Sequence, residues 1–137
     1  MRWPAVAGAV VVALLLLVLL PRLLRSREDR LRDFLVAERE ALLEGEDAAF
    51  FAGIDPAVKY QSAGGMAEVR RDHAKFRSAG VGRVTFTKEQ VKLDEAGADV
   101  TLEALLSAGL RPIASVSVQI RLQEDDGAWR ATSISWR

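Results

Sequence analysis

Three kinds of hydrophobic pattern follow one another along this chain. Residues 5–20 form an unbroken apolar run of sixteen residues, without a charged or hydrogen-bonding side chain. Residues 26–52 and 66–78 then carry apolar side chains three and four positions apart, which is the spacing of amphipathic helices. Between them, Val58 and Tyr60 alternate over a brief extended piece. From residue 83 onward, apolar and polar side chains alternate, which is typical of strands with one buried face. The pattern therefore predicts one apolar helix, a helical region and a sheet.

The apolar run predicts a single-pass transmembrane anchor over residues 3–25, with the lipid bilayer as its partner. A helix needs about 20 residues to cross a hydrocarbon core of roughly 30 Å, and flanking residues such as Trp3 lengthen the run enough. A cleaved secretory signal is the alternative, but no small-residue cleavage pattern follows the run. The arginines after the span slightly favour a cytoplasmic domain, whereas short N-terminal anchors more often deliver their domain across the membrane. The side of the membrane therefore stays open.

Three amphipathic helices are predicted, over residues 26–44, 46–52 and 66–78. Ser26 is the expected N-cap of the first helix, and Gly45 is its expected end. We expect Glu38 and Arg39 to lie on the outward side of that helix. The third helix carries His73 on its apolar face, which is expected to face the sheet.

Four long strands are predicted after the helices, with inward-facing rows over residues 84–93, 98–106, 114–122 and 128–136. The alternation changes parity near residues 88–90 and again in the last strand, and each change predicts a β-bulge. Asp126–Gly127 predicts a tight hairpin before the last strand. The predicted fold class is α+β, with three helices packed on a strongly curved antiparallel sheet of about four strands. Such a sheet forms a cone with an apolar interior.

Three short motifs resemble the nuclear-transport-factor-2-like superfamily, whose fold is the cystatin-like α+β cone. They are Glu46–Phe51 in the second helix, Asp55–Pro56 after it, and Gly127–Arg130 at the start of the last strand. The order of the elements over residues 26–137 is similar as well. The resemblance implies a cone that often holds a ligand pocket, and dimers that form through the sheet. Members include ketosteroid isomerases, dehydratases, cyclases and non-catalytic modules, so the fold alone does not choose a function.

Within the expected cone, three side chains are candidates for catalysis. His73, the one histidine of the chain, could act as an acid or base, or it could pack in the core. Tyr60 could donate its hydroxyl to a substrate oxygen, or it could pack with its hydroxyl at the surface. Asp55 could act at the pocket mouth or cap the turn before a proline. The inward strand rows hold no Asp, Glu or His, which counts against catalysis. The residues expected to line the pocket are Phe50, Phe51, Tyr60, His73, Phe86 and Trp136.

The outer face of the sheet is a candidate interface for a homodimer or another protein partner. Its small polar side chains are Thr101, Glu103, Ser115, Ser117, Gln119 and Arg121. Simple exposure to water is the alternative. The chain has nineteen basic and nineteen acidic side chains, and three of the arginines lie in residues 1–26. The remainder is therefore mildly acidic, which argues against a nucleic-acid partner.

Several other site classes are also disfavoured by composition. With one histidine and no cysteine, the sequence predicts no metal site, and no phosphate-binding glycine motif implies a cofactor. The leading hypothesis is a membrane-tethered, non-catalytic binding or assembly module for a protein partner, a second copy or a small apolar ligand. The alternative is a small-molecule isomerase, dehydratase or cyclase that uses the cone pocket.

Overall fold

The computed structural model describes residues 3–23 and 26–137, and the chain divides into two compact units, Met1–Asp33 and Phe34–Arg137. The first unit contains helix α1 (Trp3–Leu23) and the beginning of helix α2 (Arg27–Glu44). Among the residues that the structure describes, no helix is both long enough and apolar enough to cross a membrane. The predicted anchor over residues 3–25 is therefore not supported, and its last two residues lie outside the described ranges.

The three amphipathic helices are found where the sequence predicts them: α2, α3 (Asp47–Ala52) and α4 (Met66–Ser78). Ser26 caps α2 as expected, because its Oγ accepts a hydrogen bond from the backbone N–H of Asp29 at 3.1 Å. Gly45 ends α2 with a φ of +76°, a left-handed conformation that costs glycine little. These boundaries follow from local side-chain chemistry, which explains why the sequence predicts them well.

The sheet has five strands, which corrects the prediction of about four antiparallel ones. They are β1 (Ile54–Tyr60), β2 (Arg83–Leu93), β3 (Gly97–Ala108), β4 (Arg111–Asp125) and β5 (Ala128–Trp136). Their order is β1-β5-β4-β3-β2, and β1 pairs in parallel with β5. Because β1 lies at the edge of the sheet, it tolerates Pro56, which lacks a backbone donor. The sheet is therefore mixed, with an antiparallel meander of four strands and one parallel edge strand.

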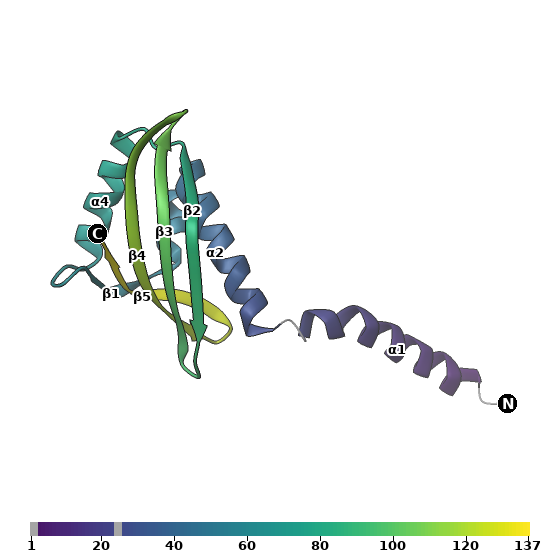
Figure 1. The fold of residues 1–137 in the computed structure, drawn as a ribbon. Helices are drawn as coiled ribbons and strands as arrows, with labels where there is room; N and C mark the ends of the chain where they lie inside the picture. The colour runs from purple at the N-terminus through teal and green to yellow at the C-terminus, as the bar shows by residue number, and fades with distance from the viewer. Residues whose placement is uncertain (1–2, 24–25) are drawn as a thin grey trace. The chain divides into compact units, whose positions relative to one another are not determined.

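Both predicted changes of parity correspond to irregular pairing. In β5, the register shifts opposite Arg121 and Leu122, which leaves Thr132 without a partner in the ladder. In β2, the shift falls between Phe86 and Lys88, slightly before the predicted position. The last hairpin turns at Asp126 and Gly127, which have φ values of +50° and +80°, as its sequence predicts. Bulges increase local twist, and the long strands of the meander bend visibly along their length (Figure 1).

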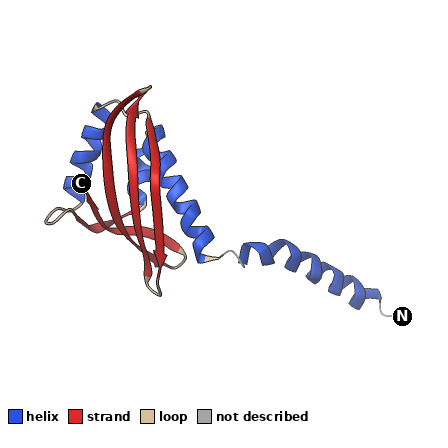
Figure 2. Cartoon of the chain, in the orientation of Figure 1, coloured by secondary structure: helices blue, strands red, loops and turns tan. Residues whose placement is uncertain are grey.

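Within the unit Phe34–Arg137, helices cover one face of the sheet (Figure 1 and Figure 2). The inward row of β3 is almost fully buried, as predicted: Ala98, Val100, Leu102 and Ala104 are each 7% exposed or less. Its register with β4 places Val118 opposite Leu102 and Val116 opposite Ala104. One apolar face of the meander thus points toward the helices, and the polar face points away from them.

Candidate ligand-binding cavity

A cavity of about 550 Å³ lies between the helices and the concave face of the sheet within the unit Phe34–Arg137. Its wall comes from α2, α3, α4 and all five strands, and most of the lining side chains are apolar. Pockets that bind small molecules usually measure about 300–1,000 Å³ and combine apolar walls with a few polar groups. The cone is therefore hollow enough for a small molecule.

Five of the six side chains predicted to line the pocket do so: Phe50, Tyr60, His73, Phe86 and Trp136. Phe51 is the exception, since it is not part of the lining. Its ring instead meets the Phe50 ring edge-on at 5.3 Å and lies 4.3 Å below the guanidinium carbon of Arg70. Adjacent residues on a helix point in different directions, so Phe50 and its neighbour cannot both face the cavity.

Tyr60 lies in a fully formed hydrogen-bond chain. Its hydroxyl donates to Asp72 Oδ2 at 2.6 Å and accepts a hydrogen bond from Trp136 Nε1. Burial and, after it, the hydrogen bond to Asp72 raise the pKa of Tyr60 from 10.0 to about 12. The chain connects β1, α4 and the end of β5. Because the Tyr60 proton is already donated to Asp72, this hydroxyl is poorly placed to donate to a substrate.

His73 lies among aromatic side chains at the wall of the cavity. Its ring stacks on Phe50 at 5.2 Å and meets Phe51 edge-on at 4.9 Å. Its Nε2 is 3.4 Å from Asp47 Oδ1, yet it forms no hydrogen bond with any described residue. Burial lowers the pKa of His73 below its ordinary value, and the nearby Asp47 carboxylate opposes this change only in part.

The structure does not join His73 and Tyr60 in one network, although both line the cavity. Tyr60 interacts with Asp72 and Trp136, whereas the charged neighbours of His73 are Asp47, Arg70 and Arg77. Asp55, the third candidate for catalysis, is not among the lining residues. Its Oδ1 accepts a hydrogen bond from the backbone N–H of Ala57 at 2.7 Å, which is a local capping contact.

Glu38 lines the cavity, which corrects its predicted outward orientation, and Arg39 lines it as well. The signal for Glu38 was present in the sequence. It follows Leu35 by three positions and precedes Leu42 by four, so it falls in the middle of the apolar face of α2. Its charge led to the opposite prediction, since carboxylates are seldom buried without a partner.

The Glu38 carboxyl has no hydrogen bond or ion pair with any residue that the structure describes. Burial alone raises the pKa of Glu38 from 4.5 to about 7. A carboxyl with a pKa near neutrality can exchange protons at physiological pH, which is the property required of a general acid or base. Glu38 is therefore the strongest candidate for chemistry in the cavity.

Gly53 makes room for this carboxyl. A Cβ atom on Gly53 would overlap with Oε1 and Cδ of Glu38, so any larger residue would displace the acid. The backbone of Gly53 is itself fixed, because its carbonyl accepts a hydrogen bond from the N–H of Ala131 at 2.9 Å. Gly53 thus determines the position of the carboxyl through the space it leaves free.

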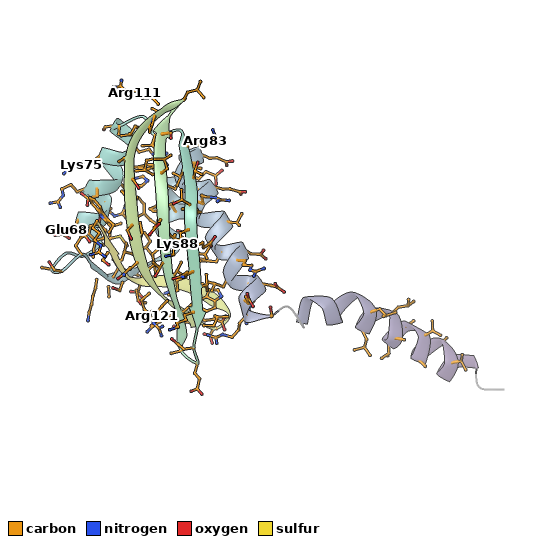
Figure 3. The ribbon with its side chains drawn as sticks, in the orientation of Figure 1. Glu68, Lys75, Arg83, Lys88, Arg111 and Arg121 are labelled. Carbon is orange, nitrogen blue, oxygen red and sulfur yellow. The ribbon has the colours of Figure 1, made fainter. Side chains whose placement is uncertain are left out.

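The six candidate interface residues share the outer face of β3 and β4, as predicted. The register pairs Thr101 with Gln119 and Glu103 with Ser117. Arg121 is held on this face by an ion pair with Asp94, which keeps the pKa of that carboxyl below its usual range. Figure 3 shows Arg111 and Arg121 toward opposite ends of β4. Within the part of the chain that the structure describes, no three His, Asp or Glu side chains form a cluster suited to a metal ion.

No protein-family model matches the sequence, and a search of curated proteins finds no significant match. Solved structures do match. One is a proposed ketosteroid isomerase from Shewanella frigidimarina, with a TM-score of 0.64 and 18% identity, covering 82% of this chain and 95% of that one. Another is a nuclear-transport-factor-2-like protein of unknown function from Shewanella oneidensis, with a TM-score of 0.66, 17% identity and coverage of 81% and 98%.

A third match is a protein of unknown function with a cystatin-like fold from Nostoc punctiforme. It has a TM-score of 0.66 and 13% identity, and the alignment covers 80% of this chain and 88% of that one. At such identities the likeness concerns the fold and not the activity. The layers, the curved five-stranded sheet and these matches together show that the chain has the nuclear-transport-factor-2-like, or cystatin-like, α+β fold.

Proposed function

We propose that this protein is a binding module for a small, mostly apolar molecule held inside the cone. The observation that supports this function is the cavity of about 550 Å³ with its mainly apolar lining. Removing apolar surface from water supplies about 25 cal/mol for each Å² buried, so a ligand of matching size would gain most of its affinity from burial. The few polar side chains in the wall would then orient the ligand.

A cavity-filling substitution tests this proposal. Val118 lines the cavity, whereas Gln119, the next residue of β4, is exposed. We expect Val118→Trp to weaken binding of a neutral naphthalene alcohol by about tenfold or more, since the indole would occupy the same space. Gln119→Trp is the matched control and should bind like the unmodified protein. Equal binding by both variants, with unchanged far-UV circular dichroism, would place the ligand elsewhere.

A proton-transfer enzyme is the second candidate function, and the raised pKa of Glu38 is the observation that favours it. Glu38 would move a proton on a bound substrate, as isomerisation or dehydration requires. Conversion of a β,γ-unsaturated ketosteroid to its conjugated isomer, followed by ultraviolet absorbance, tests this candidate. Turnover that is lost in Glu38→Gln would support it, whereas turnover unaffected by that variant would exclude Glu38 as the base.

Association with a protein partner or a second copy through the outer face of the sheet stays a prediction. Sedimentation of the purified chain would test self-association, with Gln119→Arg as a variant that adds charge to that face. Placement at a bilayer through residues 3–25 also stays a prediction from the sequence alone. A reporter fused after Arg137, combined with membrane fractionation, would test both that placement and the side on which the domain lies.

A further inference from the structure

Among the charged side chains that line the cavity, Glu38 is distinguished because it is partly buried and has no hydrogen-bond or ion-pair partner among the described residues. Besides Tyr60, the other charged or titratable lining residues are Arg39, Asp72, His73, Lys75 and Glu89. Asp72 accepts a hydrogen bond from the Tyr60 hydroxyl, and its Oδ1 lies 4.0 Å from Lys75 Nζ. Glu89 is exposed to solvent, which stabilises its charge. Glu38 has neither benefit, because it is partly buried and no opposite charge contributes to its pKa.

The cations of the lining do not supply the missing charge. Lys75 lies beside Asp72, and the guanidinium carbon of Arg39 lies 5.1 Å from the centre of the Phe86 ring. The pKa of His73 is lowered by burial, so its imidazole is mostly neutral near pH 7. The lining therefore contains three acids but only two permanent cations. A positive charge at Glu38 would compensate the unpaired acid.

The walls of the cavity are also suited to an organic cation. Phenylalanine rings from the helices and from β2 line it, as do Tyr60 and Trp136. The faces of aromatic rings attract cations within about 6 Å of their centres. Arg39 already makes such a contact with Phe86. Aromatic surface and one unpaired carboxyl are the two elements that recognise an apolar amine.

We propose that the cavity binds an apolar molecule that carries one basic amine, and that Glu38 is its counter-ion. The apolar body would lie against the sheet, and the ammonium group would donate a hydrogen bond to the Glu38 carboxylate. Such a charge-assisted bond is about twice as strong as a neutral one. An apolar carboxylate is disfavoured, because ionised Glu38 would repel it. This inference rests on the proposed binding function and adds the chemical class of the ligand.

Three probes of similar shape test the inference: 1-naphthylmethylamine, 1-naphthalenemethanol and 1-naphthylacetic acid. Their affinities for the full chain are measured by calorimetry at about pH 8 and about pH 5.5, on either side of the Glu38 pKa. At the higher pH, we expect the amine to bind about tenfold more tightly than the alcohol, since the carboxylate is ionised. At the lower pH, this preference should fall to about twofold or less, because Glu38 is then protonated.

Substitution of Glu38 separates its role from that of the cavity. In Glu38→Gln, the ratio of amine to alcohol affinity at about pH 8 should fall to about one, since no counter-ion remains. Glu40→Gln removes an exposed acid from the same helix and should keep the full ratio. A preference for the amine that survives Glu38→Gln, or a preference for the carboxylate in the unmodified protein, would overturn the assignment.

The alcohol distinguishes failure of this inference from failure of the proposed function. If the alcohol and the amine bind equally well at both pH values, the proposal that the ligand carries an amine is wrong, but the proposed binding function is still supported. If none of the three probes binds the unmodified protein, the cavity is not a binding site for such molecules and both proposals fail. Tight binding of the amine alone, lost in Glu38→Gln, supports both.

Discussion

Tyr60 and Glu38 line the same cavity but differ in how their polar atoms are satisfied. The Tyr60 hydroxyl has both a donor and an acceptor partner, Trp136 and Asp72. Glu38 has no such partner among the described residues, and burial alone shifts its pKa. Buried polar groups with complete hydrogen bonds stabilise one arrangement of the fold, whereas an unpaired buried acid costs stability. The contrast indicates that Tyr60 serves the structure and that Glu38 is available to a ligand.

The largest effect on stability is expected for Tyr60, whose hydroxyl has both of its hydrogen-bond partners. Tyr60→Phe removes the hydroxyl and leaves both Asp72 Oδ2 and Trp136 Nε1 without their partner. We expect the free energy of unfolding to fall by about 1–3 kcal/mol, as measured by urea denaturation. Ser62→Ala removes an exposed hydroxyl and serves as the control, with an expected change within about 0.5 kcal/mol. Equal stability of the two variants would contradict a structural role for Tyr60.

Glu38→Gln should instead raise the free energy of unfolding. The folded state holds the Glu38 proton up to about pH 7, whereas the unfolded state releases it near the ordinary glutamate pKa of 4.5. Unmodified protein therefore loses stability as the pH rises between these values, and the loss is complete above about pH 7. Full conversion of the pKa difference gives about 3 kcal/mol, and partial exposure of the carboxyl reduces this to about 1–2 kcal/mol.

Urea denaturation at about pH 5 and about pH 8 measures this effect. Glu38→Gln should be the more stable protein at the higher pH, by about 1–2 kcal/mol, with little difference at the lower pH. Glu40→Gln, on the exposed side of α2, should show no such dependence on pH. If the difference in stability between Glu38→Gln and the unmodified protein is the same at both pH values, the Glu38 carboxyl has an ordinary pKa.

A smaller effect on stability is expected from Gly53→Ala. The added methyl group would meet the end of the flexible Glu38 side chain, which can move away at a cost below about 1 kcal/mol. Displacement of the carboxyl toward water would lower the pKa of Glu38 and weaken the pH dependence of unfolding. Gly97→Ala is the contrast, because its methyl group would meet the backbone carbonyl of Leu122. That variant should lose more stability, about 1–3 kcal/mol.

The smallest effect concerns Arg39, the cation beside Glu38 in the sequence. Arg39→Gln removes the contact with the Phe86 ring and should cost about 0.5 kcal/mol in thermal denaturation. Lys88→Gln, which changes an exposed cation of β2, is the control. Arg39→Gln should not change the pH dependence of stability, since burial alone raises the pKa of Glu38. Loss of that dependence would show that the two side chains act together.

The sequence by itself determined the features that depend on neighbouring residues. Helix α4 lies at its predicted residues, and Ser26 and Gly45 bound α2 as expected. The alternating rows of β3 and β4 and the hairpin at Gly127 follow from local periodicity and turn chemistry. Most of the pocket wall was predictable for the same reason, because an inward row on a strand or helix is a local property.

Only the tertiary structure decided the arrangements that join distant parts of the chain. The parallel pairing of β1 with β5 brings Tyr60 and Ile134 together, and the hydrogen bond between Tyr60 and Trp136 spans 76 positions. The room for the Glu38 carboxyl depends on Gly53, which leaves space that a Cβ atom would fill. Such contacts arise from packing across the sheet, which sequence periodicity does not encode. The apolar walls of the candidate site were therefore predictable, and the spacing of Glu38 in α2 indicated its inward direction, but the space that Gly53 leaves for its carboxyl was not predictable.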